Sequence, residues 1–69
     1  MDNYKKDLIK KIKKVRVDKS ITQAELATKA KISINYYARL ERGEENPSMD
    51  VLLRITKILN LKSSEVLPF

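Results

Sequence analysis

Residues 22–43 read TQAELATKAKISINYYARLERG, and this stretch carries the signals for two short helices joined by a tight turn. Thr22 precedes Glu25 by three residues, which is the capping-box pattern of a helix start. Ser33 is a suitable N-cap for the second helix, and Gly43 is suited to end it because only glycine enters the left-handed conformation freely. The stretch therefore predicts one helix over about 22–30 and another over about 33–42.

The second predicted helix has two chemically different sides. At 100° per residue, Tyr37 faces inward, and we expect its ring in the core with its hydroxyl at the edge. Asn35, Arg39 and Arg42 face outward, and Tyr36 lies on the flank. A face made of an amide, two guanidinium groups and a phenol suits phosphates and base edges, although it also suits an ordinary polar surface.

The remaining segments predict further helices around this pair. Residues 4–20 read YKKDLIKKIKKVRVDKS, which is the pattern of an amphipathic helix. Its lysines either form a solvated face or, near the N-terminal end, contact phosphates. Residues 49–60 follow a cap at Ser48, and residues 63–69 form a last short turn. The prediction is an all-α, compact five-helix bundle in one domain, 1–69, with a central helix-turn-helix of the kind that places a helix in the DNA major groove.

Composition narrows the possible functions. The 69 residues include no cysteine and no histidine, so disulfides, a Cys/His zinc site and an imidazole base are excluded. We therefore expect no enzyme, no catalytic residue, no metal site and no cofactor. No apolar run is long enough for a signal peptide or a membrane span, which favours a cytoplasmic protein without a membrane partner.

The charge points to a polyanion as the partner. The formal net charge is +6, and residues 1–20 hold eight Lys/Arg against three Asp. The excess therefore lies before the helix pair, and this distribution disfavours a nonspecific RNA or nucleic-acid binder, which would need basic charge along residues 33–42.

The sequence from residue 8 to residue 67 resembles the Cro/repressor-type helix-turn-helix family, also called the xenobiotic-response-element family. Three motifs carry the resemblance: the Thr-Gln-x-x-Leu-Ala start at 22–27, Glu-Arg-Gly at 41–43 and Asn-Pro-Ser at 46–48. Members include phage repressors and restriction-modification controller proteins. The resemblance implies a lambda-repressor-like fold and a transcriptional regulator that binds a double-stranded DNA operator in a sequence-specific manner.

The resemblance also implies roles for individual residues. Ile34, Asn35, Tyr36 and Arg39 match positions that contact bases, and Gln23, Ser33, Arg42 and Asn46 match positions that contact phosphates. Arg16 and Glu41 match a structural salt bridge. Two positions depart from the family pattern: Lys31 stands where a glycine is common in the turn, and Ile34 replaces a polar residue, so that we expect it to contact a thymine methyl.

One recognition helix reads only a few base pairs, so the resemblance implies a homodimer on a two-fold symmetric operator. Residues 49–60 contain more apolar side chains than one inward stripe requires. The surplus ones, together with two in the tail, are candidates for the dimer interface. The alternative is that the small core buries them all. These candidates are Val51, Leu53, Ile58, Leu67 and Phe69. The absence of an appended domain leads us to expect regulation through dimerisation rather than a small-molecule ligand.

The same apolar positions leave a second function open. An antitoxin-like protein-interaction module would use them to mask a partner enzyme and would also bind its own promoter. The two functions are compatible, because both place residues 33–42 on DNA.

Overall fold

The structure is a computed structural model that describes residues 3–61, and every regular element in that range is helical. The helices are α1 (Asn3–Asp18), α2 (Gln23–Lys29), α3 (Ile34–Glu41) and α4 (Met49–Ile58), and no strand occurs among the described residues. The prediction of an all-α fold is confirmed. The fifth helix expected at 63–69 lies outside the described residues, as do the candidate interface residues Leu67 and Phe69.

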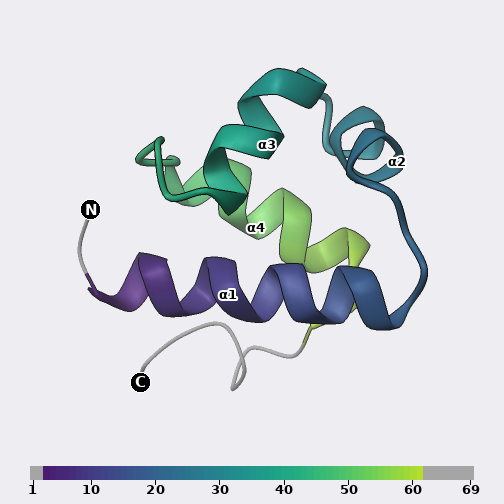
Figure 1. The fold of residues 1–69 in the computed structure, drawn as a ribbon, viewed down its shortest axis with the longest axis horizontal. Helices are drawn as coiled ribbons and strands as arrows, with labels where there is room; N and C mark the ends of the chain where they lie inside the picture. Colours follow the sequence, from purple (N-terminus) through teal and green to yellow (C-terminus); the bar gives the residue numbers. More distant parts are fainter. Residues whose placement is uncertain (1–2, 62–69) are drawn as a thin grey trace.

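The helices enclose one hydrophobic core. In Figure 1, α1 runs along one edge of the molecule, α2 and α3 occupy the opposite edge, and α4 lies between them. Helix α3 packs against both α1 and α2, and α2 also packs against α4. The core residues are Leu8, Ile9, Ile12, Leu26, Ala27, Ala30, Tyr37, Leu40, Val51, Leu52, Ile55 and Leu59.

Helix α4 presents a wider apolar stripe to this core than its spacing predicted. Leu52, Ile55 and Leu59 are buried as expected, but Val51 is also buried, with 9 % of its surface exposed. The prediction of Val51 as a surplus interface residue is therefore wrong. Val51 lies one turn before Ile55 on nearly the same side of the helix, so the core absorbs it. Leu53 stays 48 % exposed.

Each helix is followed by a residue with the left-handed backbone conformation, two positions after the last helical residue. These residues are Ser20, Lys31, Gly43 and Asn60, with φ of 58°, 60°, 78° and 59°. At each end the following residue donates its amide to the carbonyl five residues back, as Ile32 does to Ala27 at 3.0 Å, which is the Schellman arrangement. Lys31 itself adopts the left-handed conformation in place of the glycine that is common in this turn, so the turn between α2 and α3 is made without glycine.

Candidate nucleic-acid interface

Helix α3 presents most of its predicted base-contacting residues to solvent. Ile34 is 51 % exposed, Asn35 and Arg39 are exposed, and Tyr36 is half-buried and packs against the core. The Ser33 hydroxyl accepts the Tyr36 amide at 3.0 Å and caps the helix. Its proton remains available to donate, because the cap uses only the oxygen as an acceptor. These five side chains thus belong to one short helix and its cap, with Ser33 to Tyr36 at the start of α3 and Arg39 in its last turn.

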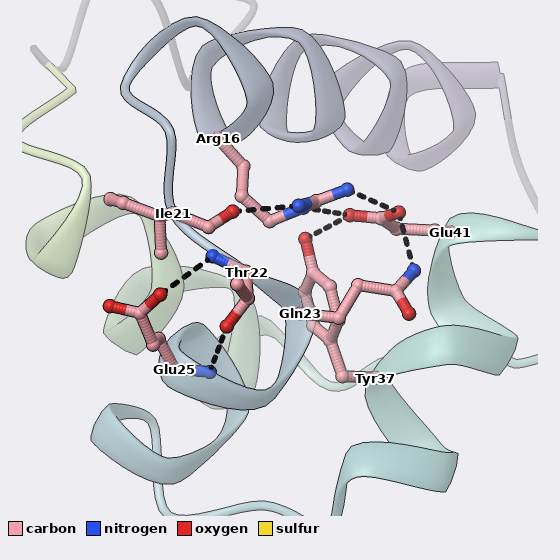
Figure 2. A network of polar contacts seen from close by, with 7 residues as sticks. All are labelled: Arg16, Ile21, Thr22, Gln23, Glu25, Tyr37 and Glu41. Atoms are coloured by element: carbon pink, nitrogen blue, oxygen red, sulfur yellow. Dashed lines mark hydrogen bonds and ion pairs between the residues drawn. The ribbon is translucent and has the colours of Figure 1, made fainter.

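A single carboxylate fixes the direction of this helix. Glu41, at the end of α3, accepts hydrogen bonds from Arg16 of α1 at 2.7 and 3.2 Å. It also accepts the Gln23 side-chain amide of α2 at 2.9 Å and the Tyr37 hydroxyl. Arg16 in turn donates to the Ile21 carbonyl at 2.7 Å. Figure 2 shows the resulting network, which connects α1, the start of α2 and α3.

The network determines the charge of its members. Burial opposes ionisation of Glu41, but the hydrogen bonds from Arg16, Tyr37 and Gln23 outweigh it and hold the pKa of Glu41 below its ordinary value. Burial, and then the hydrogen bond to Glu41, raise the pKa of Tyr37. The Glu41 hydrogen bond also raises the pKa of Arg16. At neutral pH the centre is therefore an ionised carboxylate with charged and neutral donors around it.

The sequence indicated only part of this network. Arg16 and Glu41 form the ion pair that the resemblance implied, at 2.7 Å. Gln23 was expected to bind a phosphate, and the structure ties one of its amide protons to Glu41. The second amide proton can still donate to a phosphate. The Tyr37 hydroxyl points to Glu41, a contact that the four-residue spacing of these two residues could have indicated.

Two acids after α3 pair with the arginines of the outward face. Glu44 binds Arg42 through two hydrogen bonds of 2.8 and 3.2 Å, and Glu45 lies 3.8 Å from Arg39. Sequence reasoning did not place these acids at the edge of the face. The Arg42 hydrogen bond lowers the pKa of Glu44. Because each acid lies beside a guanidinium group, both compete with any anion for it.

The loop between α3 and α4 is held by the beginning of α1. The Lys5 ammonium group donates to the Pro47 carbonyl at 2.9 Å and to the Asn46 side-chain oxygen at 3.4 Å. Asn46, a predicted phosphate contact, is exposed. The loop that comes after the recognition helix and the start of α1 therefore form one continuous surface.

Neither a cluster of metal-ligand side chains nor a membrane-spanning helix occurs in the described part of the chain. Among residues 3–61, no group of three or more histidine, cysteine or acidic side chains is placed to hold a metal ion. None of the helices in the same range is long and apolar enough to cross a membrane. This surface offers hydrogen-bond donors and acceptors, positive charge and one exposed aliphatic side chain.

Comparisons with known proteins agree with this geometry. A family model described as helix-turn-helix matches residues 12–66. The chain is also similar to the "Immunity repressor protein" of Bacillus phage phi105, with 36 % identity over 56 residues, which cover 81 % of this chain and 39 % of that relative. The chain thus spans less than half of the length of this relative. No solved structure gives a significant match. The chain belongs to the helix-turn-helix family, as its two short helices and their turn indicated.

Proposed function

We propose that the protein is a transcriptional regulator that binds double-stranded DNA in a sequence-specific manner, with α3 in the major groove. The observation that carries the proposal is the exposed set Ile34, Asn35 and Arg39 on a helix that the Glu41 network fixes to α1 and α2. Membership of the helix-turn-helix family and the similarity to a phage immunity repressor support it.

Each side chain of the surface has a role that suits its chemistry. The Asn35 amide is suited to adenine, the Arg39 guanidinium to guanine, and Ile34 to a thymine methyl. Tyr36 contacts a base or the backbone beside them. The expected phosphate contacts are Gln23, Ser33, Arg42 and Asn46, which surround the groups that contact bases and set the register of α3 on the duplex.

We infer that the protein acts as a homodimer on a two-fold symmetric operator, with half-sites about 34 Å apart. Leu53, in the middle of α4, is 48 % exposed, and Ile58, the last residue of the same helix, is half-buried. These apolar groups are available for an interface between two copies, and their burial would link DNA affinity to protein concentration.

The first test is selection of binding sites from random duplex DNA at near-physiological salt. A two-fold symmetric motif with half-sites one helical turn apart is the expected result. Enrichment of no motif, with weak binding that disappears as salt rises, would contradict sequence-specific recognition.

The role of Arg39 is tested by comparing two variants on the selected operator and on random DNA. Arg39→Ala is expected to lose roughly 1–3 kcal/mol on the operator and to relax one base position, because it removes a base contact. Gln23→Ala is expected to weaken binding to all sequences alike, because phosphates carry no sequence information. Equal losses of Arg39→Ala on both DNAs would refute its assignment to a base.

A second candidate function is an antitoxin-like module that masks a partner protein and binds its own promoter. The exposed Leu53 supports this function as well as dimerisation. Affinity capture from the host with wild type and with Leu53→Glu separates the two functions. A partner captured only by wild type, in place of a second copy of the chain, would favour the antitoxin-like module.

A further inference from the structure

A second basic surface lies beside the end of α3 and shares only Arg42 with the residues assigned individually to DNA. It is a depression of about 230 Å³ between the N-terminal half of α1 and the C-terminal end of α3. Its lining residues are Lys6, Ile9, Lys10, Glu41, Arg42 and Gly43.

Positive charge in this depression is available to a ligand. Lys6 and Lys10 are exposed and lie one helical turn apart, and neither has an ion-pair partner among residues 3–61. The Glu41 carboxylate is occupied by its three donors. Arg42 is paired with the exposed Glu44 at 2.8 Å, a contact that an incoming anion can replace because surface ion pairs are weak.

The depression also has open space beside Gly43. Gly43 carries no side chain, and the space where a Cβ would stand has no other atom within 4 Å. An approaching group therefore meets backbone and three cationic side chains. Lysine ammonium groups suit a phosphate in this setting because they act as point charges on flexible stems and need no fixed geometry.

The depression continues the expected DNA surface. Arg42 belongs both to it and to the predicted phosphate contacts. Lys5, directly before Lys6 on α1, reaches the Asn46 side chain and the Pro47 carbonyl. A duplex that contacts the loop after α3 thus passes the first turns of α1, where the excess positive charge of the sequence is concentrated.

We propose that Lys6, Lys10 and Arg42 bind a phosphodiester of the DNA backbone that flanks the half-site, with Arg42 exchanging Glu44 for the phosphate. This inference rests on the proposed function and extends the contact surface from the helix pair to α1. The site adds affinity and salt dependence but no sequence preference, because phosphates are the same in every sequence.

The test measures the affinity of a Lys6→Gln/Lys10→Gln variant for operator and random DNA over a series of salt concentrations. The matched control is Lys29→Gln/Lys57→Gln, which removes the same charge from exposed lysines of a different basic depression, on α2 and α4. The plot of log affinity against log salt has a negative slope, and the magnitude of this slope is expected to decrease by about one to two for the first variant. The control is expected to change the slope by less than half of that, and the operator-to-random affinity ratio stays constant in both.

Equal slope changes in the two variants would overturn the inference, since the effect would then be one of net charge. A lower operator-to-random ratio in the Lys6→Gln/Lys10→Gln variant would also overturn it, because the lysines would be contributing to sequence recognition. Wild type tests the proposed function separately: if it shows no preferred sequence, that function fails, whereas the slope on random DNA still reports on the lysine pair. Circular dichroism verifies that both variants are folded.

Discussion

At the scale of single residues, Glu41 has the largest structural consequence. Its side chain is 4 % exposed, and that of its partner Arg16 is 12 % exposed. A buried ion pair stabilises the fold little more than an apolar pair of the same shape would. Loss of one partner, however, leaves the charge of the other uncompensated. Because Glu41 also accepts the Gln23 amide, the same loss would remove this hydrogen bond between α3 and α2.

We expect Glu41→Gln to lower the free energy of unfolding by about 2–4 kcal/mol at pH 7, because the Arg16 charge loses its counterion and a neutral amide replaces the acceptor. Thermal or urea unfolding followed by circular dichroism measures this loss. The control is Glu25→Gln, which removes the same charge at an exposed position and keeps the capping box. If the two variants were equally stable, the network would have no structural role.

The Glu41 carboxylate should also contribute to the pH dependence of the free energy of unfolding. Since the folded-state pKa of Glu41 lies below its ordinary value of 4.5, its contribution is fully present above about pH 4.5 and is lost as the pH falls through the folded pKa. Wild type should therefore lose stability in acid more steeply than Glu41→Gln. Parallel pH profiles of the two proteins between pH 6 and pH 3 would contradict this assignment.

At the scale of elements, all four helices are followed by a residue in the left-handed conformation. The helices differ in the residue that comes directly after it. This residue is apolar at Ile21, Ile32 and Leu61, and each of the three packs against the core. After Gly43 the corresponding residue is Glu44, which is exposed and binds Arg42. The end of α3 therefore remains open to solvent on the side where the depression beside α1 lies.

The turn between α2 and α3 can be tested with glycine. Lys31→Gly is expected to raise the free energy of unfolding by roughly 0.5–1 kcal/mol, because glycine adopts a φ of 60° without the cost that a Cβ imposes. Lys29→Gly, at the last residue of α2, is expected to lower it by about the same amount. Chemical denaturation measures the free energy of unfolding of both variants. A loss of stability in Lys31→Gly would show that the backbone conformation of Lys31 carries no strain.

At the scale of the whole molecule, two exposed aliphatic residues allow a matched test of the dimer. Leu53 on α4 and Val17 on α1 are 48 % and 55 % exposed. Leu53→Glu is expected to give a monomer at concentrations where wild type and Val17→Glu are dimers, and to weaken operator binding. Analytical ultracentrifugation measures this. A wild-type protein that stays monomeric at every concentration would exclude the proposed homodimer in solution.

The sequence determined the local features of this molecule. Thr22, Ser33 and Ser48 cap their helices as predicted, and the inward and outward sides of α3 follow its period. These features depend on residues three or four positions apart, so a single chain segment contains all the information that they require.

Only the tertiary structure decided which distant groups meet. Gln23 reaches Glu41 across 18 positions, and Lys6 and Lys10 line the same depression as Arg42 because α1 packs against α3. The burial of Val51 was decided in the same way, since a core of this size absorbs whatever apolar surface the packing angle of α4 turns toward it. Contacts of this kind depend on how helices pack, and helix periodicity does not specify the packing.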